Sequence, residues 1–229
     1  TANGTYEIKP RHELDKLNVI EFNGHFDKNG TYKRLRKAYV NNEIRLALIG
    51  ENRDTTKVSG TQFAERCLLS SPYKNGILFS TARTVYYWDI VRNSIEDLAL
   101  KQSYFKDRIF YMGTVGDYTL LSSSGGGILL FNENHKVQIR SEFGLVSDFC
   151  DHIYVQDDRT IWAGSANGLS RIFLPEGNPK DYQIQNYRSG SGLKTDKITS
   201  ISEWNDCIVA SNPYGLNFLP SSPITNNAF

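Results

Sequence analysis

The sequence predicts an all-β fold, a β-propeller of four-stranded antiparallel blades, from three observations. First, 13 Tyr, 12 Phe and 3 Trp favour strands, and 18 Gly supply turns. Second, short apolar segments alternate with turn signals, and no amphipathic helix of ordinary length stands out. Third, a segment recurs in about five copies, with central turns near residues 42, 84, 126, 168 and 214. Four-stranded units at this spacing are typical of propeller blades.

Two copies of the repeat are especially clear. The residues Gly144-Leu145-Val146-Ser147-Asp148 correspond to Gly192-Leu193-Lys194-Thr195-Asp196. Further along, Asn167-Gly168-Leu169 corresponds to Tyr214-Gly215-Leu216. Because the offset is 48 at the first glycine and 47 at the last, a one-residue deletion is expected in the turn near Asn205.

Each copy is expected to contain four strands, A to D. In the clearest copy, Asn167-Gly168 is a two-residue hairpin signal, for which both residues take positive φ. A weaker copy near the N-terminus has strands at 32–40 and 43–49. In the clearest copy the four strands are expected at residues 148–156, 160–165, 169–174 and 182–187.

A single propeller domain is predicted over residues 1–229, either a small closed ring or a fragment of a larger one. The last copy ends in strand C, so we expect residues 5–9 to complete it and remove its open edge. The approximate blades are 11–59, 60–100, 101–142, 143–188 and 189–229.

Charge and residue spacing exclude several classes of function. With 26 Lys and Arg against 25 Asp and Glu, the net charge is +1, which provides no field to attract nucleic acid. The apolar runs are too short to cross a bilayer, so no membrane insertion by this chain is expected. Cys67, Cys150 and Cys207 form no C-x-x-C motif, and the four His show no ligand spacing. No metal and no cofactor are therefore expected, and the thiols are predicted to be structural, with one disulfide as the alternative.

Propeller geometry predicts where a ligand would bind. The D–A and B–C connections share one face, where propellers usually bind their ligands, and residues 166–168 and 189–197 belong to it. The predicted ligand contacts on this face are Asp148, Asn167, Lys194, Asp196 and Tyr214. Asp148 and Asp196 occupy equivalent positions, and the alternative role for each is to cap its own turn. No catalytic residue is predicted.

The positions of two aromatic side chains and of one basic segment can also be predicted. Trp162 is expected to pack between blades, with sugar stacking as the alternative. Trp204 lies at an A–B turn, where an exposed aromatic side chain would mark an interface. The basic run at residues 33–37 is expected on a solvated or edge strand, and a patch for an anionic glycan is the alternative.

The copies resemble the two-component regulator propeller repeat. In that family a unit begins with Gly-Leu-Pro-Ser-Asn or similar and ends with Ile-Trp-Ile-Gly-Thr-x-x-Gly-Leu. Residues 144–148 match the beginning, and Ile161-Trp162-Ala163-Gly164-Ser165-Ala166-Asn167-Gly168-Leu169 match the end. The chain departs from the pattern at Val146 and Lys194, where the family has Pro, and at Val209, where it has Trp.

The resemblance implies a sensor. Such repeats look like the periplasmic part of hybrid two-component systems that detect glycan fragments, and the resemblance implies a parent chain that would continue through a further β-sandwich, one membrane span and a histidine kinase. A non-catalytic, periplasmic binding module for an oligosaccharide is therefore expected. The expected partners are an oligosaccharide or a partner protein, with a homodimer formed through the parent receptor. A protein-binding scaffold and, less favoured, a propeller glycoside hydrolase or lyase are the alternatives.

Overall fold

A computed structural model describes residues 6–7, 18–26, 32–40, 43–50, 55–176 and 178–221. These residues form strands and short 3₁₀-helices, with no α-helix among them. The chain divides into two compact units, Thr1–Ile109 and Phe110–Phe229. That both belong to one propeller domain, with the blade limits given above, stays a prediction.

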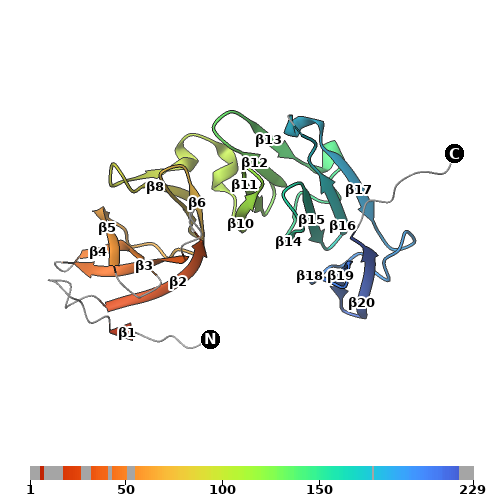
Figure 1. The fold of residues 1–229 in the computed structure, drawn as a ribbon, viewed down its shortest axis with the longest axis horizontal. Coiled ribbons are helices and arrows are strands. Elements are labelled where there is room, and N and C mark those ends of the chain that lie inside the picture. The colour runs from red at the N-terminus through yellow and green to blue at the C-terminus, as the bar shows by residue number, and fades with distance from the viewer. Residues whose placement is uncertain are drawn as a thin grey trace. The chain divides into compact units, whose positions relative to one another are not determined.

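The first unit contains two sheets (Figure 1). In each sheet the strands follow one another in chain order. The five-stranded sheet comprises β1 (Tyr6–Glu7), β2 (Asn18–Phe26), β3 (Tyr32–Val40), β4 (Glu43–Ile49) and β5 (Thr55–Gln62). The four-stranded sheet comprises β6 (Leu69–Tyr73), β7 (Gly76–Ser80), β8 (Val85–Asp89) and β9 (Ser94–Asp97).

The second unit contains three sheets, again with strands in chain order. The first comprises β10 (Ile109–Val115), which begins at the boundary residue, β11 (Tyr118–Ser123), β12 (Ile128–Phe131) and β13 (Lys136–Ile139). The second comprises β14 (His152–Val155), β15 (Thr160–Ser165), β16 (Gly168–Phe173) and β17 (Gln183–Tyr187). The last comprises β18 (Ser200–Trp204), β19 (Cys207–Asn212) and β20 (Gly215–Pro220).

These sheets confirm the predicted fold class, an all-β protein built of propeller blades. The four strands expected in the clearest copy are β14 to β17, and they pair antiparallel in the expected order. Strand β15 begins and ends at the expected residues, whereas β14 begins four residues later than expected, at His152. The weak N-terminal copy is confirmed as the hairpin of β3 and β4.

The predicted deletion lies in the A–B turn of the last sheet. There Asn205 and Asp206 alone connect β18 to β19, and both have positive φ, +46° and +58°. This is the pattern of a type I′ hairpin turn, whose twist matches that of the flanking strands. The prediction of the same pattern at Asn167-Gly168 is wrong: only Gly168 has positive φ, +131°.

Two expectations for the first unit differ from the structure. Strand β1, at Tyr6–Glu7, pairs with β2, whereas residues 5–9 were expected to complete the last sheet. Strand β3, which carries the basic run, lies inside its sheet between β2 and β4, so it is neither an edge strand nor fully solvated. Arg36 is only 3% exposed, and burial lowers the pKa of Lys37.

Apolar side chains fill the space between successive sheets of the second unit. One cluster includes Leu120, Leu130 and Ile161, from β11, β12 and β15. The next includes Trp162, Ile208 and Leu219, from β15, β19 and β20. Trp162 has no exposed surface, so the prediction that it packs between blades is confirmed.

The three cysteines are free thiols. Cys67 and Cys150 are buried, each two residues before the first strand of its sheet. Burial raises the pKa of each of these thiols to about 12. Cys207 lies on β19 and is partly exposed.

Candidate functional site

The loop before β14 is closed by Asp148. Its Oδ1 accepts a hydrogen bond from the backbone N–H of Ser141 at 2.6 Å, and its Oδ2 accepts one from Arg140 Nη2 at 3.2 Å. The N–H of Leu145 also donates to the carbonyl oxygen of Arg140, at 3.1 Å. Gly144 takes a φ of +100°, a conformation that favours glycine.

The loop before β18 repeats this arrangement. Asp196 Oδ1 accepts from the N–H of Ser189 at 2.5 Å, again seven residues upstream. The N–H of Leu193 donates to the carbonyl oxygen of Arg188 at 3.3 Å, and Gly192 has a φ of +112°. The shared sequence is therefore Arg-Ser-x-x-Gly-Leu-x-Ser/Thr-Asp. Sequence reasoning missed its Arg-Ser beginning, although the identical spacing before each Asp could have indicated it.

Both loops are also tied to the third strand of the sheet that follows them. The N–H of Val146 donates to Ser170 Oγ at 2.9 Å, and the N–H of Lys194 donates to Asn217 Oδ1 at 3.0 Å. Ser170 and Asn217 are equivalent positions, on β16 and β20. The loop backbones thus have fixed positions against their sheets.

The carboxylate of Asp196 stabilises its loop in the ionised form. The hydrogen bond from the backbone of Ser189 lowers the pKa of Asp196 below its ordinary value of 3.8. A depressed pKa means that the stabilisation is present above the unfolded-state pKa and is lost as the pH falls through the folded-state value.

Replacing Asp196→Asn should therefore remove a pH-dependent contribution to the stability of this loop. In the wild-type protein we expect the amide resonance of Ser189 to titrate with a midpoint below 3.8, and in Asp196→Asn this transition should be absent. Nuclear magnetic resonance between pH 6 and pH 2.5 would measure it. A midpoint above 3.8 in the wild-type protein would contradict the hydrogen bond described for Asp196.

Asn167 and Tyr214 occupy equivalent positions in two B–C turns. Their backbone N–H groups donate to side chains at the ends of the preceding strands: to Ser165 Oγ at 3.0 Å and to Asn212 Oδ1 at 2.8 Å. Both side chains are exposed, and Tyr214 is 78% exposed. Side-chain caps of this kind close turns that lack two positive φ values.

The structure brings the predicted residues to one end of the sheets. The loop from Arg188 to Asp196 begins beside the turn of Asn167, since a Cβ at Gly168 would lie 3.2 Å from Arg188 Cγ. The same loop contacts β20 through the bond between Lys194 and Asn217. Asn167, Lys194 and Tyr214 expose their side chains there, while the two carboxylates bond within their own loops.

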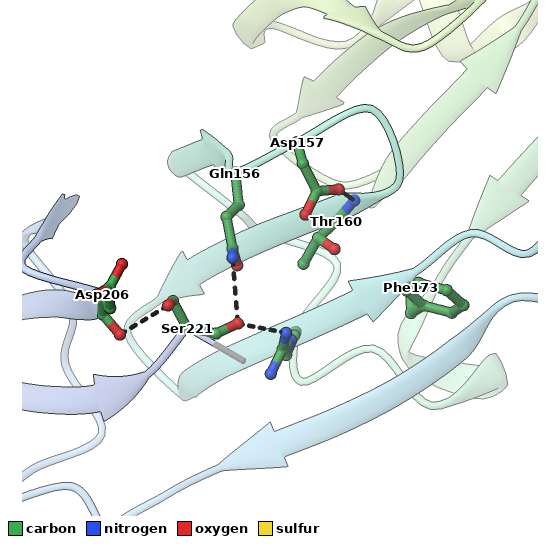
Figure 2. A pocket seen from close by; sticks show the side chains of 7 residues that line it. Gln156, Asp157, Thr160, Phe173, Asp206 and Ser221 are labelled. Carbon is green, nitrogen blue, oxygen red and sulfur yellow. Dashed lines mark hydrogen bonds between the residues drawn. The ribbon is translucent and has the colours of Figure 1, made fainter. Parts of the chain in front are cut away.

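Sequence reasoning missed a pocket at the opposite ends of these strands (Figure 2). Its volume is about 470 Å³, within the range of small-molecule sites. Figure 2 shows the side chain of Gln156 and the backbone of Ser221 joined by a hydrogen bond. In this view Phe173 lies to the right of them and Asp206 to the left. The lining residues are Gln156, Asp157, Thr160, Arg171, Phe173, Asp206 and Ser221.

Arg171 is the buried charge of this pocket, only 7% exposed. Its guanidinium lies 5.1 Å from the ring centroid of Trp162, within the range of a cation–π contact. Its Nη2 donates to the carbonyl oxygen of Ser221 at 2.6 Å, and Gln156 Nε2 donates to the same oxygen at 3.1 Å. These contacts fix the side chain of Arg171 between the sheet of β14 to β17 and the sheet of β18 to β20.

In the part of the chain that the structure describes, no three His, Cys, Asp or Glu side chains gather as a metal ion would need. None of the helices described is long and apolar enough to cross a membrane.

Comparison with known proteins supports the fold and leaves the family open. No protein-family model and no curated protein matches the chain. The computationally designed Ika8 protein is similar to 89% of this chain, with 12% identity and a TM-score of 0.57. A catalytically inactive virginiamycin B lyase from Staphylococcus aureus, solved with quinupristin, is similar to 88%, with 11% identity and a TM-score of 0.54.

The chain spans 58% of the designed protein and 66% of the lyase. The extracellular domain of the putative hybrid two-component system BT4673 from B. thetaiotaomicron is similar to 87% of this chain, with 9% identity and a TM-score of 0.44. The solved structures that match include β-propeller proteins. The chain has the β-propeller fold.

Proposed function

We propose that the chain is a non-catalytic binding module that recognises an oligosaccharide through Asn167, Lys194 and Tyr214. One observation carries the proposal: these three residues expose their side chains, while their backbone N–H groups are held by Ser165, Asn217 and Asn212. A surface whose backbone is fixed before binding loses little conformational entropy when a ligand arrives.

The chemistry of the three side chains suits a sugar. A Tyr ring offers an apolar face together with a hydroxyl group, so it can cover a sugar ring and hydrogen-bond at its edge. The Asn amide donates and accepts, and the Lys ammonium donates, which matches a ligand covered with hydroxyl groups. Asp148 and Asp196 hold the loops and take no direct part in this proposal.

The sequence motif supports a role in signalling. Its resemblance to two-component regulator propeller repeats favours a periplasmic sensor that acts on behalf of a membrane-bound histidine kinase. In such a receptor, a ligand that binds one arrangement of the sensor domains more tightly shifts the population toward it.

Calorimetric titration of the full 229-residue chain with neutral and acidic oligosaccharides tests this proposal. We expect a member of the panel to bind, and we expect Tyr214→Ala to weaken it about 10-fold or more, as truncation of a central aromatic contact does. Phe173→Ala, which changes the pocket at the other end of the strands, is the control and should leave the affinity unchanged.

Each other outcome overturns part of the proposal. Binding that is lost in Phe173→Ala and kept in Tyr214→Ala would show that the oligosaccharide binds in the pocket lined by Phe173. No heat from any oligosaccharide would favour a protein-binding scaffold. Release of new reducing ends from the panel would identify a glycoside hydrolase or lyase.

A further inference from the structure

The loop before β14 (residues 140–148, the first loop) and the loop before β18 (residues 188–196, the second loop) share one arrangement of hydrogen bonds but carry opposite net charges. The first loop has one basic and two acidic residues and a net charge of −1. The second loop has two basic and one acidic residue and a net charge of +1. Because the second loop borders Asn167 and Tyr214, its charge affects which ligand can bind there.

The arginines that begin the two loops differ in their partners. The guanidinium of Arg140 lies 3.4 Å from a carboxylate oxygen of Glu142 and 3.2 Å from one of Asp148, so its charge is neutralised inside the first loop. Where the first loop has Glu142, the second loop has Gly190, which offers no carboxylate. Within the described parts of the chain, the guanidinium of Arg188 accordingly forms no ion pair and donates no hydrogen bond.

Lys194 differs in a similar way from Val146, its equivalent in the first loop. Val146 is buried and packs beside Gly168, since a Cβ there would lie 2.8 Å from its Cγ2. The side chain of Lys194 is exposed, and a Cβ at the equivalent Gly215 would meet nothing within 4 Å. The ammonium group of Lys194 forms no ion pair with any described residue, so it is available to a ligand.

Both cations border the surface proposed to bind the oligosaccharide. Arg188 lies beside the turn that contains Asn167. Lys194 is bonded through its backbone to β20, the strand that follows Tyr214. The single carboxylate of the second loop, that of Asp196, accepts a hydrogen bond from the backbone of its own loop. The loop therefore presents an excess of positive charge beside exposed polar and aromatic side chains.

We propose that the oligosaccharide recognised by this surface is acidic, with a carboxylate or sulfate group held by Arg188 and Lys194. This ligand class rests on the proposed function, because it concerns the same surface. A guanidinium presents its N–H groups in a fork that fits two oxygens of a carboxylate or sulfate, and an ammonium adds a compact charge. Neither cation has to break an ion pair with a described residue before it meets the ligand.

Calorimetric titration of the full chain with matched pairs of oligosaccharides tests the ligand class. Each pair has the same sugar rings, with free carboxylates in one member and uncharged methyl esters in the other; oligogalacturonates are one such pair, and sulfated and unsulfated oligosaccharides extend the panel. We expect an acidic member to bind most tightly. Raising the salt concentration from about 50 mM to about 500 mM should weaken its binding more than that of any neutral member, because salt screens exposed charges.

Two variants test the residues assigned to the acidic group. Arg188→Gln and Lys194→Gln should each weaken binding of the acidic member about 3- to 10-fold, as the loss of an exposed charge pair with its hydrogen bonds does. Each should change the affinity for the uncharged member of the pair much less. Lys180→Gln is the matched control, because Lys180 is an exposed lysine at the other end of β16 and β17, and it should leave both affinities unchanged.

The outcomes separate this ligand class from the proposed function. If neutral members bind at least as tightly as their acidic partners, the acidic ligand is wrong and the oligosaccharide-binding module stands. If no member of the panel binds, the proposed function fails, and the acidic ligand fails with it. If Lys180→Gln weakens the acidic member as much as Arg188→Gln does, the attraction comes from the overall charge, and the assignment of Arg188 and Lys194 is overturned.

Discussion

Replacing Trp162→Ala is expected to cost about 3–5 kcal/mol of unfolding free energy, the range for large aromatic side chains in a core. Trp162 has no exposed surface and stacks on Tyr187, with 5.7 Å between ring centroids. Its Nε1 donates to Gln156 Oε1 at 2.8 Å. The substitution removes the largest side chain between two sheets and leaves the buried guanidinium of Arg171 without its ring.

Equilibrium unfolding of the full chain in urea, followed by circular dichroism, would measure this loss. Trp162→Phe keeps a ring but not the N–H group, so it should lose less unfolding free energy than Trp162→Ala. The control is Phe143→Ala, at a residue that is 59% exposed, which should change stability by no more than about 0.5 kcal/mol. A loss below about 1 kcal/mol for Trp162→Ala would contradict the packing described here.

Replacing Gly168→Ala is expected to destabilise the protein by about 1–3 kcal/mol more than the equivalent Gly215→Ala. Both glycines begin a third strand with nearly the same φ, +131° and +133°, so the backbone strain of an alanine is nearly the same. Their surroundings differ. A Cβ at Gly168 would lie 2.6 Å from the carbonyl oxygen of Tyr187, whereas a Cβ at Gly215 would meet nothing within 4 Å.

This difference arises from the fourth strand and from the loop before β14, since a Cβ at Gly168 would also lie 2.8 Å from Val146 Cγ2. Tyr187 ends β17, the fourth strand of its sheet, while the last sheet has three strands among the residues described. Comparing the free energies of unfolding of the two alanine variants separates these close contacts, with Tyr187 and with Val146, from the common strain. Equal losses would show that the close approach at Gly168 relaxes freely.

The repeat explains why the blades could be predicted so closely. Strand β15 has the expected limits, and the deletion near Asn205 is a tight turn with two positive φ values. These features depend on residues within a few positions of one another: turn formers, alternating apolar residues and side chains that cap their own backbone. The capping role left open for Asp148 and Asp196 is of the same local kind.

The candidate site was predictable in part for the same reason. The B–C turns and the loops before the first strands meet because strand order within a blade dictates it, so Asn167, Lys194 and Tyr214 lie at one end of the sheets. The pocket at the opposite ends of these strands was not predictable from the sequence. It depends on Arg171 and Gln156 reaching Ser221, residues 50 and 65 positions apart from it.

By itself the sequence therefore determined the strands, the turns, their period and the caps of the loops, because hydrogen bonds over a few residues and alternation of side chains set them. Only the tertiary structure decided which faces are covered. It placed the basic strand β3 inside a sheet, paired β1 with β2, and left Phe218 exposed where Arg171 is buried in the sheet before it. Burial depends on which sheet packs against which, and that contact joins residues whose separation along the chain no local pattern records.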